Sequence, residues 1–264
     1  MTTLTPQNTV ERRSAPIPLS RLVRVELRKL VDTRAGFWLV ASMGVISLVV
    51  AVVMLIARRN SPEKLDLSGF VTVMNMPTSV ILPILAIMLV TAEWSQRTAL
   101  ATFTMEPRRE RVVLAKLGAS LIAAIGAVVF ALVIGALANV LAGVVYGAPA
   151  GAWNFSGADL VNSLTIQVFG LLVGFGFAAL ILNTPGAVVA YFALPSAMGI
   201  VAGVVPWFRD HLGRWIDTTS TNQPFQTGDW ASGIEWARLA VSAMIWIGIP
   251  LALGIIRILR SEIK

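Results

Sequence analysis

Six long apolar stretches constrain this chain more than any other feature of its sequence. None of them contains a charged residue, and they cover residues 37–57, 70–92, 117–147, 160–182, 186–208 and 239–256. At a rise of about 1.5 Å per residue, a helix over each stretch can cross a hydrocarbon core of about 30 Å, the last with the least to spare. The sequence therefore predicts an all-α integral membrane protein whose six transmembrane helices cover about residues 37–57, 70–92, 113–147, 160–182, 186–208 and 237–257.

The composition also indicates a membrane protein. Apolar residues make up 56% of the 264 residues and charged residues 13%, which would leave a soluble domain with a surface that it could not hydrate. The sequence has no cysteine, so it offers no disulfide, iron–sulfur ligand or thiol nucleophile. Residues 1–36 are polar and basic and lack the apolar core of a secretory signal, so we expect the first membrane helix to act as its own insertion signal.

Basic residues set the expected orientation. Fifteen of the 21 Lys and Arg residues precede residue 37, lie between the second and third stretches, or follow the sixth. Because cytoplasmic loops carry an excess of Lys and Arg, we expect both termini in the cytoplasm and the chain in the inner (cytoplasmic) membrane. The net charge of +7 then reflects topology and not a nucleic-acid site. The turn at 183–186 has no Lys or Arg to hold it inside, which makes it the weakest point of this topology.

The basic N-terminal region is expected to have two parts. Residues 1–18 form a flexible leader, and residues 19–36 form an amphipathic helix on the inner membrane surface, ahead of a single membrane domain over 37–264. Apolar residues recur at helical spacing in this helix, at Leu19, Leu22, Val23, Leu27, Leu30 and Val31. The helix is either a basic anchor on anionic lipid or a docking element for a cytoplasmic protein, and both interpretations stay open.

The segment between the second and third stretches is too charged to enter the membrane. An acidic residue at its start is followed by a threonine, a Pro-Arg element and a lysine before the third stretch: Glu93, Arg97, Thr98, Pro107, Arg109 or Arg111, and Lys116. With the run from Glu26 to Lys29, this pattern resembles the permease subunits of ABC-2 type (type V exporter-like) ABC transporters. Many members of that family have glycine where this chain has Arg97.

The resemblance implies partners and roles for particular residues. Two permease chains, identical or different, would pair in the membrane, and two copies of a separate ABC ATPase would dock beneath them. A short helix after the second span would contact the ATPase, with the N-terminal helix as a second contact. The ATPase-coupling candidates are then Glu26, Lys29, Glu93, Arg97, Thr98, Arg108, Arg109 and Arg111. Alternatively, these charges only stop transfer and solvate the surface.

The sequence contains no phosphate-loop motif of the form G-x-x-x-x-G-K-[ST]. The chain is therefore expected to be no enzyme and to hold no cofactor, with ATP and Mg²⁺ bound by the partner ATPase. His211 is the single histidine, which with the absence of cysteine disfavours a metal site.

No Asp, Glu, Lys, Arg or His lies in the interior of a predicted span, which disfavours an ion-coupled carrier. We therefore expect the permease subunit of an ATP-driven exporter of an amphipathic or lipophilic substrate, such as a drug, antibiotic, peptide or lipid. Asn75 and Gln167 are candidates to line its pathway, although interhelical hydrogen bonding explains them as well. A non-transporting scaffold or sensor subunit is the main alternative, ahead of an ion-coupled carrier. Residues 206–236 form either re-entrant helices or an interfacial loop.

Overall fold

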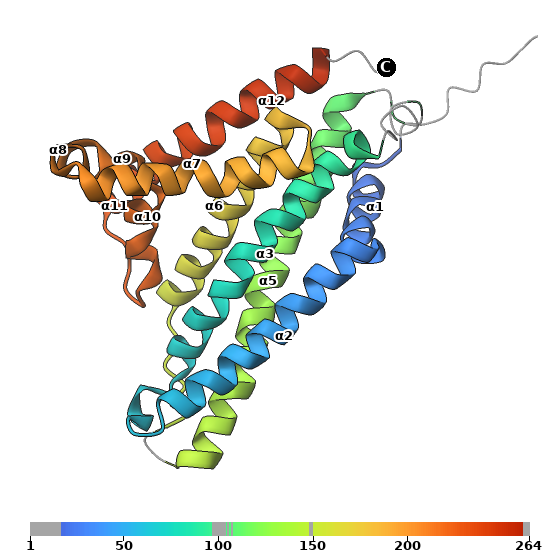
Figure 1. Cartoon of the computed structure of the whole chain (residues 1–264). Coiled ribbons are helices and arrows are strands. Elements are labelled where there is room, and N and C mark those ends of the chain that lie inside the picture. The colour runs from blue at the N-terminus through green and yellow to red at the C-terminus, as the bar shows by residue number, and fades with distance from the viewer. Residues whose placement is uncertain (1–16, 97–103, 105, 107, 148–149, 261–264) are drawn as a thin grey trace, which may run out of the picture.

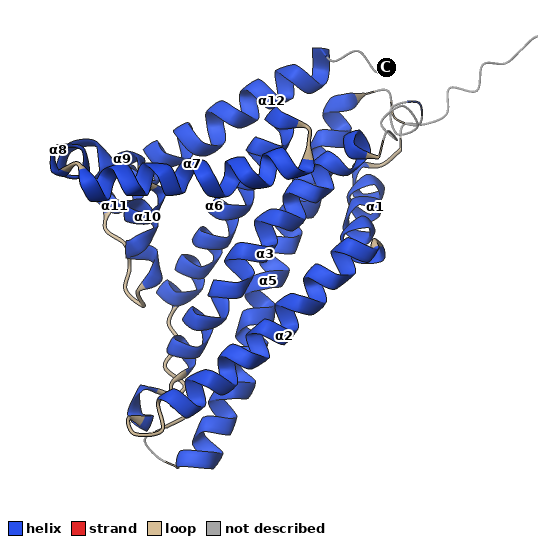
Figure 2. Ribbon diagram, viewed as in Figure 1, coloured by secondary structure: helices blue, strands red, loops and turns tan. Residues whose placement is uncertain are grey.

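The structure, a computed structural model, describes residues 17–96, 104, 106, 108–147 and 150–260 (Figure 1). In these residues the regular elements are helices, and the only β-type pairing is an isolated bridge between Asp66 and Ala152 (Figure 2). The longer helices are α1 (Leu19–Asp32), α2 (Arg34–Ala57), α3 (Leu67–Ser95), α5 (Arg109–Tyr146), α6 (Gly157–Ile181), α7 (Thr184–Val204), α11 (Gly233–Ala243) and α12 (Ile249–Arg260). The π-helical turn η4 (Met244–Gly248) joins α11 to α12.

Six helices in the described residues are long and apolar enough to cross a membrane: α2, α3, α5, α6, α7 and the continuous helix from α11 to α12. This confirms the predicted all-helical, multi-pass architecture. Several helices extend a few residues beyond the predicted spans, as α5 and α11 do by beginning at Arg109 and Gly233, and two other differences break a predicted helix. The fifth helix ends at Val204 and not at residue 208, because Val205 has an extended backbone. The expected helix over 19–36 is divided at Thr33, which is also extended and whose Oγ1 accepts a hydrogen bond from the Gly36 N–H at 3.1 Å, capping α2.

Helices α3 and α6 form the centre of the bundle. In the most apolar 18-residue window of each, 67% and 56% of the residues are buried, against 17% in α2 and 11% in α7. Glycine lets the two central helices approach closely, since a Cβ at Gly174 of α6 would lie 3.0 Å from the carbonyl oxygen of Pro83 in α3. The peripheral helices α2 and α7 keep large exposed apolar faces, as expected for helices in contact with lipid.

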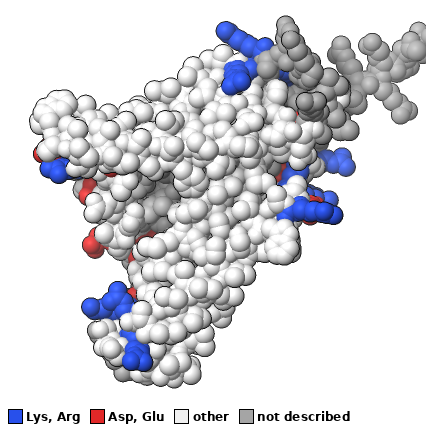
Figure 3. All heavy atoms as spheres, viewed as in Figure 1, with Lys and Arg blue, Asp and Glu red and all other residues white. Residues whose placement is uncertain are grey.

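Charged side chains gather at the two ends of the bundle, and much of the surface between them in the view of Figure 3 is uncharged. At one end lie α1, the start of α5 and the end of α12, and we call it the α1 end. Arg109 joins two of these helices there by donating from Nη1 to the carbonyl oxygen of Ile258 at 2.7 Å. The turn between α6 and α7 lies at the same end, because Arg257 of α12 donates to the carbonyl oxygen of Leu180.

At the opposite end, the chain between α7 and α11 forms short helical segments: α8 (Pro206–Phe208), η2 (Arg209–Gly213), α9 (Arg214–Ile216), α10 (Thr218–Asn222) and η3 (Gln223–Gln226). They pack on the sixth membrane helix. The Trp246 indole N–H donates to the carbonyl oxygen of Ile216 at 2.7 Å, and the rings of Phe225 and Trp236 meet edge to face with centroids 4.8 Å apart. Much of this segment is thus helical and anchored, not an irregular loop.

The contact between α6 and α12 depends on a residue without a side chain. A Cβ at Gly254 would lie 2.6 Å from the carbonyl carbon of Ala179, a distance that requires one helix to move. We expect Gly254→Ala to cost about 1–3 kcal/mol through overpacking and to lower the melting temperature, followed by tryptophan fluorescence in detergent. Gly126→Ala is the matched control, because that mid-helix position has nothing within 4 Å of a Cβ. Equal melting temperatures for the two variants would contradict the close α6–α12 contact.

Candidate functional site

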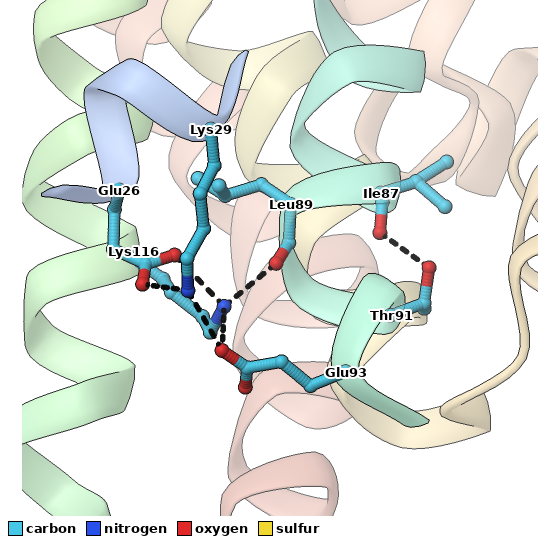
Figure 4. A network of polar contacts seen from close by, with 7 residues as sticks. All are labelled: Glu26, Lys29, Ile87, Leu89, Thr91, Glu93 and Lys116. Carbon is cyan, nitrogen blue, oxygen red and sulfur yellow. Dashed lines mark hydrogen bonds and ion pairs between the residues drawn. The ribbon is translucent and has the colours of Figure 1, made fainter. Parts of the chain in front are cut away.

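Four charged side chains from three helices meet at the α1 end and form a closed ring of ion pairs (Figure 4). Lys29 Nζ lies 2.6 Å from Glu26 Oε1 and 2.9 Å from Glu93 Oε1. Lys116 Nζ lies 2.9 Å from Glu26 Oε2 and 3.2 Å from Glu93 Oε1. Each carboxylate therefore contacts both ammonium groups. We call these four residues the charged ring; it joins α1, α3 and α5.

Most of the charged ring is buried. The side chains of Lys116, Glu26 and Glu93 are 5%, 6% and 7% exposed, whereas that of Lys29 is 37% exposed. Lys116 also donates to the carbonyl oxygen of Leu89 at 2.8 Å. Two positive and two negative charges cancel, so the ring is buried as a neutral unit. A single buried charge would be far more costly, because desolvation of an unpaired ion costs several kcal/mol.

Lys29 stays protonated in this setting. Burial alone lowers the pKa of its ammonium group, but the hydrogen bond to Glu26 and the attraction of Glu93 outweigh that effect and raise the pKa above its ordinary value. The ammonium is therefore charged throughout the physiological pH range. The ring keeps its alternating charges wherever the two glutamates are ionised.

Local helix geometry brings these groups together. Glu26 and Lys29 are three residues apart on α1, and Leu89 and Glu93 are four residues apart on α3, so each pair lies on one face of its helix. Below the ring, α1 packs on the bundle through a shared apolar cluster that contains Leu30, Leu85, Leu89 and Ala119 together with the partly buried Val23 and Leu27. The predicted apolar face of α1 thus contacts protein over much of its length.

The structure distributes the predicted ATPase-coupling residues over distinct environments. Glu26, Lys29 and Glu93 belong to the charged ring, so they contact one another and Lys116. Three arginines lie at the start of α5: Arg108, Arg109 and Arg111. Arg111 donates to Glu106 Oε2 at 2.8 Å and to the carbonyl oxygen of Ile17, whereas Arg108 is exposed. Arg97 and Thr98 lie outside the described residues.

Sequence reasoning missed that Glu93 and Lys116 are buried partners. Both residues lie within membrane-length helices, α3 and α5, although close to their ends. In the sequence each adjoins an apolar stretch, where a charge ordinarily marks the membrane boundary. The sequence did contain one signal: Glu93 at the end of the second predicted span and Lys116 at the start of the third carry opposite charges. Glu26 and Lys29 form a second acid–base pair in the N-terminal helix. Only the packing of α1 shows that the two pairs meet.

The two pathway candidates are also brought together, at the α3–α6 interface. Asn75 Nδ2 donates to Ser163 Oγ at 2.8 Å, and Gln167 Nε2 lies 3.3 Å from Asn75 Oδ1. Gln167 also donates to the hydroxyl of Thr78. Asn75 and Gln167 are 8% and 1% exposed. Both side chains therefore form hydrogen bonds between α3 and α6.

Next to this interface two cavities of about 100 and 340 Å³ adjoin one another and share the residues Ser79, Ile166 and Gln226. Together they form what we call the polar groove, between α3 and α6 on one side and α7 and α10 on the other. Figure 3 shows a hollow on this side of the molecule. Asn75 lines the smaller cavity, whereas Gln167 lines neither.

The polar groove is lined by hydroxyls, amides and aromatic rings together with aliphatic side chains such as Ile166 and Val173, and its single charged lining residue is Asp159. That carboxylate is already engaged, since it accepts hydrogen bonds from Ser68 at 2.6 Å and from the Ser156 hydroxyl at 2.8 Å. Within the described residues no group of three or more acidic or histidine side chains is arranged to hold a metal ion. The groove therefore suits a largely neutral molecule with polar and apolar parts.

No protein-family model matches the sequence, and no curated protein matches it.

Removal of one ring member should leave an unpaired buried charge. We expect Lys116→Met to destabilise the chain by about 3–5 kcal/mol, measured as a lower melting temperature in detergent. Adding Glu93→Gln should recover part of this loss, because the remaining Glu26–Lys29 pair is neutral. Lys64→Met, at an exposed lysine near the opposite end, is the matched control and should have little effect. A double variant as unstable as Lys116→Met alone would show that charge balance does not stabilise the ring.

Proposed function

We propose that the chain is the transmembrane permease subunit of an ATP-driven ABC exporter. One observation supports this most directly. The charged ring fixes α1 and α5 to α3 immediately before α3 ends at Ser95, and the resemblance places the ATPase contact in residues 97–107, which follow in the sequence. A force applied to that segment or to α1 would therefore reach α3 through ion pairs and not through a flexible joint.

Helix α3 would carry this force into the membrane. Glu93 and Asn75 are 18 residues apart on one continuous helix, which corresponds to about 27 Å along its axis. Asn75 lines the polar groove, so a displacement of the ring would move a wall of the groove. Two chains with facing grooves could in this way expose a central cavity alternately to the two sides of the membrane.

In this proposal both termini lie in the cytoplasm and the chain is a multi-pass protein of the cytoplasmic membrane. Helix α1 lies at the inner surface, beside the docking site of the ATPase, which binds ATP and Mg²⁺. Two copies of the ATPase serve two permease chains, identical or different. The groove, with the aromatic rings of Phe169, Tyr191 and Phe192 beside its hydroxyls and amides, supports an amphipathic or lipophilic substrate.

Two rival functions share this architecture. An ion-coupled carrier needs an ionisable group that can gain and lose an ion, and the buried ring provides ionisable groups. The ring, however, is fully paired and lies at the ends of α3 and α5, away from the middle of the membrane helices. A scaffold or sensor subunit would bind no ATPase and needs no groove. Both rivals predict a chain that purifies without ATPase activity.

The contact with the ATPase can be tested at an arginine that the fold does not need. Arg108 is exposed and precedes the first residue of α5 without a capping hydrogen bond from its side chain, and a negative charge at this end is favourable to the helix, so Arg108→Glu should leave the fold intact. We expect the ATPase activity that co-purifies with the tagged chain from its native cells to be at least about tenfold lower for this variant. The reason is that charge reversal at an interface costs several kcal/mol. Arg59→Glu, at an exposed arginine of the opposite end, is the control and should retain the activity.

Two other outcomes would count against the proposal. Equal co-purifying ATPase activity for the two variants would show that Arg108 does not contact the ATPase. No activity in any preparation, including the unchanged chain, would favour a scaffold or an ion-coupled carrier.

The orientation can be tested with single thiols, because the chain has no cysteine of its own. Glu110 lies in the first turn of α5 and Asn60 in the connection between α2 and α3, and both are exposed. We expect an impermeant maleimide to label Asn60→Cys in intact spheroplasts and to label Glu110→Cys only after the membrane is opened. The reverse pattern would place the α1 end outside the cell and overturn the orientation.

A further inference from the structure

A separate cavity of about 480 Å³ opens at the α1 end, where α1 turns into α2. Its wall has two chemically different halves. One half is charged and contains Lys29, Glu93 and Lys116 of the ring together with Arg34, the first residue of α2. The other half is apolar and is formed mainly by the face of α3 that carries Leu85 and Met88. Such a division fits a ligand with an ionic head and an apolar tail.

The charges of the wall favour an anionic head. Glu26 lies behind the wall and completes the charged ring, which is neutral in sum, so Arg34 leaves the ring and the wall together with one positive charge in excess. Arg34 is exposed and takes part in none of the ion pairs among the described residues. It also begins a helix of 24 residues, whose N-terminal end adds a partial positive charge at the same place. A head that carries one negative charge complements this wall.

The position of the cavity favours a lipid over a soluble anion. It lies where a membrane-length helix begins, so its charged half is at the level of the lipid head groups and its apolar half extends along α3 toward the hydrocarbon core. Met88 and Ala92 on this face are only half-buried, so the apolar half is not filled by the protein itself. Lys and Arg side chains gather on the surface near α1 and the start of α2 in Figure 3.

We propose that this cavity binds an anionic phospholipid. The phosphodiester would accept charge-assisted hydrogen bonds from Arg34 and the outer N–H of Lys29, and the first part of an acyl chain would lie against Leu85 and Met88. The lipid would fill the gap between α2 and α3 and hold the junction at Thr33 against the charged ring. This site does not depend on the transport function, since it requires only the fold and a bilayer.

Binding is measured as stabilisation of the purified chain in detergent. The melting temperature is followed by tryptophan fluorescence against increasing dioctanoyl phosphatidylglycerol, with dioctanoyl phosphatidylcholine and inorganic phosphate as the two comparison ligands. We expect phosphatidylglycerol to raise the melting temperature by several degrees at saturation, phosphatidylcholine to act only at clearly higher concentration, and inorganic phosphate to have no effect.

Two variants address the two halves of the cavity. Arg34→Gln should raise the apparent dissociation constant of phosphatidylglycerol roughly tenfold or more, because a charge-assisted hydrogen bond is lost. Met88→Trp should fill the apolar half and weaken both lipids. The controls are Arg59→Gln and Val52→Trp, at exposed positions outside the cavity, which should bind phosphatidylglycerol like the unchanged chain.

Each remaining outcome contradicts the proposal. Unchanged binding in Arg34→Gln or in Met88→Trp would place the lipid elsewhere, and the second variant decides alone if the first does not purify as a folded protein. Equal stabilisation by phosphatidylcholine would mean that the charge of the head is not recognised. An equal effect of inorganic phosphate would mean an anion site without a lipid tail. None of these results bears on the ATPase contact, which is tested separately.

Discussion

The interaction on which the rest of the structure depends is the closed set of ion pairs among Glu26, Lys29, Glu93 and Lys116. Burying any one of these charges without its partners costs several kcal/mol, so α1, α3 and α5 are compatible with a membrane only in the register that brings all of them together. That register places α1 across α3 and α5, fixes the turn at Thr33, and creates the cavity between the first two helices and α3. An apolar contact alone would allow neighbouring registers, because it has no direction.

The sequence predicted the coarse fold well, and the reason is physical. An uncharged stretch long enough to cross a bilayer has one stable backbone structure there, a helix, since nothing else satisfies its peptide groups. The same rule does not say which face of a helix meets which neighbour. The burial of Glu93 and Lys116, the π-helical turn at 244–248 and the short helices of 206–226 therefore appear only in the structure. The sequence did not predict the break at Thr33 between α1 and α2, because neither glycine nor proline occupies that position.

Tertiary contacts hold the turn at 183–186, which lacks a basic residue of its own and was therefore the weakest point of the predicted topology. The turn contains no cation of its own, yet Arg257 at the end of α12 donates to the carbonyl oxygen of Leu180 beside it. In addition, the hydroxyls of Thr184 and Thr91 lie 2.6 Å apart and join α7 to α3. A residue far away in the sequence, Arg257, thus supplies a positive charge beside a turn that contains none. Counting Lys and Arg loop by loop underestimates how firmly such a turn is held.

Helix α3 separates the two sites, and its periodicity shows how they can influence one another. At about 100° per residue, the groove residue Ser79 lies about 40° from Asn75 around the helix axis, and the cavity residues Leu85 and Met88 lie about 80° and 140° from Asn75 in the other direction. Glu93 is 18 residues from Asn75, which is five whole turns, so the ring engages α3 on the side of Asn75 while it also borders the cavity. A lipid in the cavity and a substrate in the groove would not touch. Helix α3 lines both sites, so a movement of α3 would couple them, and the charged ring is the contact that holds α3 to α1 and α5.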